Sequence, residues 1–230
     1  MLNRLFSIDT QNYQNLRNPL WFLLALLLLI MLPLVDVFTG KMTIWVLPVC
    51  STFLVVIGMY TVASSRGVFL SGLLLGLGLI VIVWINYTIG PKGWLSIVQN
   101  LLFLIFFSLL FVFLERTVLK KKKVDLYVLY GVTIGYILIG TIGSLLFSSL
   151  DLLLPGSFLD AGEVLSDYEY TYFSFVTMTT LGYGDIIPVN EPAKAVVILL
   201  SLCGQLYLAM VVAIIVGKFL AFKDLQTREI

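Results

Sequence analysis

A stretch in the C-terminal half of the chain, residues 177–188, combines residue types that can bind a cation. Within it the run TLGYGD places Gly182 and Gly184 on either side of a tyrosine, with a threonine before them and an aspartate after them. Glycine takes left-handed backbone angles without a Cβ penalty. Alternating left- and right-handed residues turns successive carbonyls to one side of an extended strand. Four such strands around an axis would stack rings of carbonyl oxygens that replace the hydration shell of a cation.

The composition predicts the class of protein to which this stretch belongs. Of the 230 residues 60% are hydrophobic and only 12% are charged, whereas a soluble domain is nearer half apolar and a quarter charged. The excess indicates a polytopic membrane protein. The chain has no histidine, which excludes imidazole metal ligands and the usual near-neutral pH switch. Cys50 and Cys203 lie in separate apolar segments and are interpreted as small buried hydrophobes.

The predicted fold is an all-α membrane protein whose helices surround this stretch. A helix is expected to begin at Asn18-Pro19, because proline is tolerated in the first turn. A shorter apolar segment, 168–180, cannot cross and is predicted to be a re-entrant helix that leads into the loop. Six segments are long enough to span a bilayer, which needs about 20 apolar residues: 19–38, 43–63, 68–89, 94–114, 126–148 and 193–220.

The charges predict the orientation. With both termini cytoplasmic, eleven of the fourteen basic residues fall in inside segments, as the positive-inside rule requires. The loop at 177–188 then lies outside. The acidic residues of the same side are interpreted either as a collar that concentrates cations or as ordinary solvated charge: Asp151, Asp160, Glu163, Asp167, Glu169, Asp185 and Glu191.

Non-helical backbone at membrane depth is tolerated only inside protein or along a water-filled cavity. The carbonyl oxygens of the loop are therefore assigned to the ions, with the Thr180 hydroxyl completing the innermost site and the amides facing outward. One chain supplies one strand, so this geometry predicts a homotetramer with cyclic symmetry. The assigned carbonyls are those of Thr180, Leu181, Gly182 and Tyr183.

The loop resembles the potassium-channel signature TVGYGD, with Leu181 where valine is commonest. Upstream, the aromatic run 170–176 resembles the pore helix of that family, and Gly204 stands nineteen positions after Asp185, where many members place a glycine in the pore-lining helix. The resemblance covers about residues 126–220 and favours a small prokaryotic-like member.

The resemblance implies K⁺ as the permeant ion and a role for residues around the loop. It makes Tyr172 a candidate to hydrogen-bond Asp185, with Thr179 and Gly184 as further support of the filter. Gly204 is a candidate hinge, although glycine in membrane helices is as often a close-packing point. Val176 replaces a glutamate found in some members, which puts carboxylate-pair control of inactivation in doubt.

The first four predicted spans lack the charges of a voltage sensor. The fourth, 94–114, contains no arginine or lysine, so steep voltage gating is not expected. The run Lys120, Lys121, Lys122 and Lys123 is predicted to contact anionic lipid, and Lys218 to extend toward the inner membrane boundary. The predicted divisions are an N-terminal cytoplasmic segment 1–18, a four-helix domain 19–114, a basic linker 115–125, a pore domain 126–222 and a tail 223–230.

The sequence therefore predicts a potassium-selective channel of the cell membrane. The alternatives are a poorly selective cation channel and a non-conducting membrane subunit or transporter built on the same pore motif. No nucleophile–base pair, metal cluster or phosphate loop is present, so neither an enzyme, a cofactor other than the permeant ion, nor a nucleic-acid partner is expected.

Overall fold

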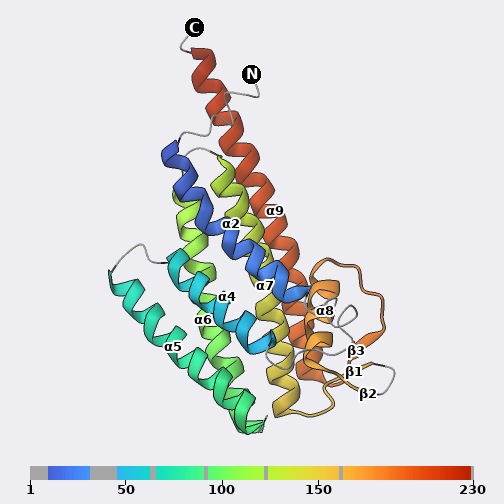
Figure 1. The fold of residues 1–230 in the computed structure, drawn as a ribbon. Coiled ribbons are helices and arrows are strands. Elements are labelled where there is room, and N and C mark those ends of the chain that lie inside the picture. Colours follow the sequence, from blue (N-terminus) through green and yellow to red (C-terminus); the bar gives the residue numbers. More distant parts are fainter. Residues whose placement is uncertain are drawn as a thin grey trace.

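The computed structural model describes residues 10–31, 46–62, 66–90, 93–121, 124–160 and 163–228. In this part the chain is mostly helical, and α7 contacts α2, α6, α8 and α9. Figure 1 shows α8 and three short strands beside one end of α9, while the start of α2 and the end of α9 point to the other end. The helices are α2 (Thr10–Ile30), α4 (Val46–Val62), α5 (Arg66–Ile89), α6 (Gly93–Lys120), α7 (Leu126–Leu153), α8 (Asp167–Met178) and α9 (Glu191–Arg228).

Among the described residues, four helical stretches are long and apolar enough to cross a membrane: Gly72–Ile89, Gly93–Lys120, Leu126–Leu153 and Glu191–Lys218. This confirms four of the six predicted spans by length and composition. In the other two, the described apolar stretches are the shorter Pro19–Ile30 and Pro48–Tyr60. The rest of the first predicted span, 32–38, and the start of the second, 43–45, lie outside the described residues.

The predicted start of the first helix at Asn18-Pro19 was wrong. Helix α2 is already present at Thr10, and Pro19 lies inside it. An interior proline removes one backbone hydrogen bond and is normally costly, but the Pro19 ring is fully buried. Its packing contributes to keeping the helix continuous, a tertiary effect that proline rules for isolated helices do not contain. The predicted cytoplasmic segment 1–18 is helical from Thr10 onward, and residues 1–9 lie outside the described part.

Two helices run further than their apolar segments. Helix α6 continues past Leu114 to Lys120, into the predicted linker, and α9 continues past residue 220 to Arg228. The added residues of α6 include Glu115 and Arg116, which are good helix formers. Hydropathy therefore marked where the apolar surface ends, whereas the backbone hydrogen bonds continue beyond it.

The expectation of a purely α-helical fold was also wrong in detail. Three short strands, β1 (Phe158–Asp160), β2 (Glu163–Val164) and β3 (Ile186–Pro188), form a sheet in the order β2-β1-β3. Strands β1 and β3 are antiparallel, with Phe158 opposite Pro188 and Asp160 opposite Ile186. The side chains of Phe158 and Ile186 are buried. The sheet joins the segment before α8 to the segment after the TLGYGD run, a pairing of distant short segments that periodicity does not reveal.

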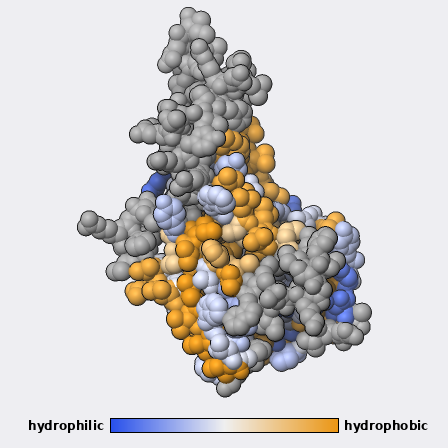
Figure 2. Space-filling model, viewed as in Figure 1, coloured by the Kyte–Doolittle hydropathy of each residue, from blue (hydrophilic) through white to orange (hydrophobic). Residues whose placement is uncertain are grey.

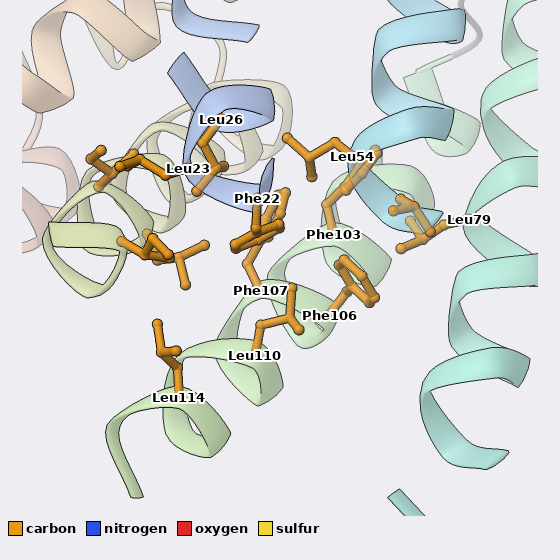
Figure 3. Packing of buried hydrophobic residues seen from close by; sticks show 14 of the residues in the cluster. Phe22, Leu23, Leu26, Leu54, Leu79, Phe103, Phe106, Phe107, Leu110 and Leu114 are labelled. Carbon is orange, nitrogen blue, oxygen red and sulfur yellow. The ribbon is translucent and has the colours of Figure 1, made fainter. Parts of the chain in front are cut away.

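In the part of the chain that the structure describes, two clusters of buried side chains hold the helices together. The first joins the four N-terminal helices to α7 through residues such as Phe22, Leu54, Leu79 and Phe107 (Figure 3). The second surrounds α8 and includes Phe147, Phe158, Phe173 and Met178. Phe175 packs against both clusters. Such van der Waals packing is the main attraction between helices in lipid, so the position of α8 depends on both groups of helices.

The outer surface fits a membrane setting. On the face shown in Figure 2, hydrophobic side chains cover much of the helical bundle, and hydrophilic ones gather toward α8 and the sheet. One face of α5 exposes large apolar side chains, among them Leu74, Leu77, Val81 and Ile85. A contiguous exposed apolar surface of this kind is unfavourable in water. The apolar helices therefore support a multi-pass membrane protein.

Candidate functional site

The loop that follows α8 has an alternating backbone. Thr180, Gly182 and Gly184 have φ angles of 60°, 54° and 79°, and no other non-glycine residue of the described part has a positive φ. Left-handed angles were expected at the two glycines and are present. Thr180 was not expected, because a β-branched residue in this region is a genuine outlier. Such a conformation costs about 1–3 kcal/mol and persists only where the surroundings impose it.

The last turn of α8 supplies part of that constraint. The carbonyl oxygen of Val176 accepts hydrogen bonds from the amides of Leu181 at 3.0 Å and Gly182 at 3.3 Å, and the amide of Thr180 bonds to the Thr177 carbonyl at 3.1 Å. The first three amides of the loop are thereby directed toward the end of α8.

The loop is open on one side within a single chain. The side chains of Leu181 and Tyr183 are 54% and 67% exposed, and Thr179, Thr180 and Asp185 are exposed as well. The Thr179 hydroxyl is directed back to α8, where it donates to the Phe175 carbonyl at 2.7 Å. Thr179 thus ends the helix and does not contribute its hydroxyl to the loop.

Tyr172 and Asp185 tie the outer end of the loop to α8. The Tyr172 hydroxyl donates a short hydrogen bond to Asp185 Oδ2, and the Ile186 amide donates to Asp185 Oδ1 at 2.9 Å. The hydrogen bond that the resemblance implied is therefore present. The Tyr172 hydroxyl lowers the pKa of Asp185 below its ordinary value of 3.8, and the same bond raises the pKa of Tyr172 to about 12. Asp185 is thus held ionised at the mouth of the loop.

We expect Tyr172→Phe to raise the pKa of Asp185 toward 3.8. A carboxyl whose pKa is lowered by folding contributes stability that is present above its unfolded pKa and is lost as the pH falls through the folded pKa. In the variant the folded and unfolded pKa values of Asp185 become similar, so this contribution is missing: the variant should be less stable near neutral pH, and its stability should fall less as the pH is lowered. Thermal unfolding of the purified protein over an acid pH series measures this difference. Tyr168→Phe, an exposed tyrosine on the same helix, is the control, and identical acid limbs for all three proteins would contradict the assignment.

Helix α8 is fixed to α7 by small and polar contacts. The Ser174 hydroxyl donates to the Gly140 carbonyl at 2.6 Å, and the hydroxyls of Ser144 and Thr171 are 2.9 Å apart. A Cβ at Gly140 would lie 2.6 Å from the Phe175 ring. The close approach of the two helices therefore requires the glycine, and the polar pairs orient α8 about its own axis.

Asp151 is a positioning residue that the sequence did not reveal. It was grouped with the outer acidic collar, but its side chain is 7% exposed. Asp151 Oδ2 accepts from the Tyr170 hydroxyl at 2.6 Å, and Oδ1 accepts from the amides of Ser157 at 2.7 Å and Phe158 at 3.3 Å. The carboxyl thereby joins the end of α7, strand β1 and α8, so Asp151 does not contribute to a collar in contact with water.

Asp151→Ala should destabilise the fold by about 3 kcal/mol or more, because each buried donor left without a partner costs about 1–3 kcal/mol. The affected donors are the three groups that now bond to the Asp151 carboxyl. Chemical denaturation of the purified protein checks this value. Asp160→Asn, which leaves these bonds intact, should change stability by much less, and equal losses in the two variants would contradict the positioning role.

One further feature of α8 was readable in the sequence and was missed. Ser166 and Glu169 form a capping box at its N-terminus, with the Ser166 amide donating to the Glu169 carboxylate. The S-x-x-E spacing before an apolar run is the usual signature of this motif. Glu169 is therefore engaged with the helix start, where a negative charge also complements the helix dipole.

Gly204 lies where α9 crosses the end of α8. A Cβ at Gly204 would be 2.3 Å from Met178 Cγ and 2.9 Å from the Met178 carbonyl oxygen. Gln205 Nε2 lies 3.5 Å from the same oxygen. Helix α9 is continuous through this position. The close packing against Met178 therefore explains why position 204 is a glycine, while the role of Gly204 as a hinge stays a prediction.

The comparisons with known proteins agree with this location of the site. Residues 131–221, from the second turn of α7 into α9, match a family model described as an ion channel. No solved structure matches the chain significantly. The matched range contains α8, the TLGYGD loop and α9 as far as residue 221, so this part of the chain is similar to an ion channel.

The curated relatives narrow the class. An inward rectifier potassium channel of Paramagnetospirillum magnetotacticum is 42% identical over 65 residues, 28% of this chain and 19% of its own length. A voltage-gated potassium channel, subfamily A member 2, of Oncorhynchus mykiss is 35% identical over 101 residues, 42% of this chain and 19% of its own. A voltage-gated potassium channel protein of Caenorhabditis elegans is 42% identical over 57 residues, 25% of this chain and 11% of its own.

The chain thus spans less than a fifth of the length of these relatives. Together the family model and the relatives support a relation to potassium channels and indicate a channel rather than an enzyme. Because the matches cover so little of the relatives, the activities of the whole relatives are not assigned to this chain.

Proposed function

We propose that the protein is a potassium-selective channel that conducts K⁺ passively across the cell membrane. The observation that carries this proposal is the alternation of left-handed residues at Thr180, Gly182 and Gly184, in a loop whose first amides bond to the end of α8. In an alternating strand with its amides turned into the protein, successive carbonyl oxygens are free for an ion. The similarity of the chain to potassium channels also supports the proposal.

The ion sites are assigned to four residues of this loop. The carbonyl oxygens of Thr180, Leu181, Gly182 and Tyr183 form the consecutive sites, and the Thr180 hydroxyl completes the innermost one. Rings of such oxygens replace the hydration shell of K⁺. Gly184, Asp185, Tyr172 and Thr179 support the loop at its two ends. No cofactor enters this account, because the permeant ion is the only ligand.

The channel is a homotetramer in this proposal. One chain contributes one strand, and closing the ring takes four. The exposure of Leu181 and Tyr183 supports this, because irregular backbone cannot face lipid and the open side of the loop therefore needs neighbouring chains. Exposed apolar side chains also run along α9, among them Leu199, Leu202 and Leu206. Copies related by a cyclic axis would cover these surfaces with one another.

Helix α8 contributes electrostatically to conduction. It has Asp167 and Glu169 in its first turn and no basic residue in its last turn. The C-terminal end of a helix carries a partial negative charge, and the loop begins there. Four such helix ends directed at a central cavity would favour a cation below the filter.

The orientation and the domain division are part of the proposal. The start of α2 and the end of α9 point away from α8 and the sheet, which supports cytoplasmic termini and an outer filter. The four-helix domain 19–114 carries no sensor charges in its fourth span, so gating by charge movement is not proposed. Residues 115–125 connect it to the pore domain 126–222, and 223–230 form the tail.

Of the four lysines at 120–123, only Lys120 is proposed to contact anionic lipid on the basis of the described residues. Lys121 Nζ is 2.9 Å from Asp125 Oδ2 and 4.2 Å from the centre of the Tyr127 ring, so its charge is partly engaged within the chain. Lys120 is exposed at the end of α6 and remains the described candidate. Lys122 and Lys123 lie outside the described residues.

Flux through the purified protein in liposomes tests the proposal. We expect K⁺ flux well above Na⁺ flux, block by barium, and loss of both flux and block in Gly182→Asp. Equal K⁺ and Na⁺ flux would support a poorly selective cation channel in its place. An absence of flux under varied lipid, pH and voltage would favour a non-conducting subunit.

A further inference from the structure

An acidic side chain on α6 contacts the inner helix α9 at a point that the proposed conduction mechanism does not use. The Tyr207 hydroxyl of α9 lies 2.8 Å from Glu115 Oε1 on α6 and 2.9 Å from the Val132 carbonyl oxygen on α7. Tyr207 is buried, with 6% of its surface exposed. One hydroxyl thus joins the last helix of the four-helix domain to both helices of the pore domain.

The number of hydrogens available for bonding at this contact bears on the protonation state of Glu115. A tyrosine hydroxyl has one hydrogen to donate, an ionised carboxylate can only accept, and a backbone carbonyl can only accept. With Glu115 ionised, the hydroxyl hydrogen of Tyr207 is directed at either Glu115 Oε1 or the Val132 carbonyl oxygen, and the other oxygen is left without a hydrogen bond from Tyr207. With Glu115 as the carboxylic acid, it donates to Tyr207 Oη, and Tyr207 donates to the Val132 carbonyl. The protonated form supplies a hydrogen for each of the two contacts.

The surroundings favour the same state. A Cβ at Gly135 on α7 would lie 2.3 Å from both Glu115 Oε1 and Tyr207 Oη, so the glycine makes room for the contact. The ring of Tyr207 packs against Phe111 and Tyr136, with centroids 6.1 Å and 6.2 Å away. A charge placed here without a partner would be costly, and an ionisable residue in a membrane helix generally marks a functional site.

The other charged groups near this contact are directed elsewhere. Arg116, next along α6, is exposed. Lys218 on α9 donates to the carbonyl oxygens of Val118, Leu119 and Lys121 at 3.3, 3.3 and 2.7 Å, and so binds the end of α6 rather than Glu115. Residues 19–31 of α2 contain no titratable side chain. The two ion pairs of the described residues join Lys121 to Asp125 and Lys194 to Glu191, and neither involves Glu115.

We propose that the Glu115 carboxyl keeps its proton near neutral pH and that this proton closes a latch, Glu115–Tyr207–Val132, which fastens α9 to α6 and α7. Loss of the proton at higher pH turns the Tyr207 hydrogen toward the carboxylate, releases the Val132 carbonyl and places a charge on a half-buried side chain, so the latch weakens as the pH rises. Lys218 provides a second tie between the same two helices. If the proposed channel function holds, the latch makes the position of α9 sensitive to internal pH.

Infrared spectroscopy of the purified protein in detergent tests the latch without requiring ion flux. At about pH 7 we expect a carbonyl absorption of a protonated carboxylic acid, which Glu115→Gln loses and which fades in the unchanged protein as the pH is raised. Glu191→Gln, which removes an exposed carboxylate on α9, is the matched control and should keep the band. Tyr207→Phe should keep the band but shift it, because the acid has lost its partner, and it serves as a second variant if Glu115→Gln fails to fold.

Thermal unfolding provides the second readout. Between about pH 6 and about pH 9, the unfolding temperature of the unchanged protein and of Glu191→Gln should fall more than that of Glu115→Gln, whose amide can donate to Tyr207 at every pH. The absence of an acid band that depends on Glu115, or the same pH dependence in Glu115→Gln and Glu191→Gln, would overturn the latch while leaving the proposed channel function untouched.

Discussion

Gly182→Ala should abolish or strongly reduce the preference for K⁺ over Na⁺. Gly182 has a φ of 54° with no atom within 4 Å of the position that a Cβ would take, so the obstacle is the backbone conformation rather than space. Left-handed angles cost a non-glycine residue about 1–2 kcal/mol. The loop relieves that strain by rotating the peptide, and rotation turns a carbonyl oxygen away from the ion path in each of the four proposed strands. Ion flux with K⁺ and with Na⁺ through the reconstituted variant measures the effect.

Gly156 provides the matched control for this substitution. It lies before β1, has a φ of 81° and also has no atom within 4 Å of its Cβ position. Gly156→Ala therefore introduces the same kind of strain away from the loop and should lower stability without changing ion preference. If both alanine variants kept the selectivity of the unchanged protein, the backbone of Gly182 would not set the ion sites.

Gly204→Ala should have the second large effect, a loss of stability and of selective conduction together. The added methyl group would lie 2.9 Å from the Met178 carbonyl oxygen and 2.3 Å from Met178 Cγ. The Met178 side chain can move, but its backbone is the last turn of α8, from which the loop starts. Separation of α9 from α8 would shift the last turn of α8, to which the Thr180 amide is hydrogen-bonded. Thermal unfolding and K⁺ flux of the same preparation measure both consequences.

Gly217→Ala is the control on the same helix. No atom lies within 4 Å of the position of its Cβ, and alanine has a higher helix propensity than glycine, so stability should be unchanged or slightly higher. A mild effect of Gly204→Ala, comparable to that of Gly217→Ala, would show that α9 can bend or shift at this point and would favour the hinge interpretation.

The sequence predicted the local geometry of the TLGYGD loop better than the scaffold around it. The left-handed angles at Gly182 and Gly184 could be predicted because glycine adopts them without a Cβ penalty. The position of α8 followed from its length and aromatic composition. The contact between Tyr172 and Asp185 came from a resemblance, since nothing in the residue types alone pairs positions thirteen apart.

The missed features depend on contacts between distant segments. The burial of Asp151 requires Tyr170 and the turn at Ser157 to converge on it, and hydropathy counts any aspartate near a helix end as exposed. The β1–β3 pairing and the continuation of α2 through Pro19 have the same origin, because tertiary packing overrides a local rule. Glu115 stood just past a predicted span and was treated as part of a linker, while the helix and its contact to Tyr207 continue there.

The reversal potential of the channel in a planar bilayer, with K⁺ on one side and Na⁺ on the other, tests the central claim most directly. Four carbonyl strands of the TLGYG type should place the reversal potential far from zero, toward the value at which K⁺ alone is the permeant ion. A current that reverses near zero under the same gradient would contradict the assignment of the Thr180–Tyr183 carbonyl oxygens as potassium-selective sites.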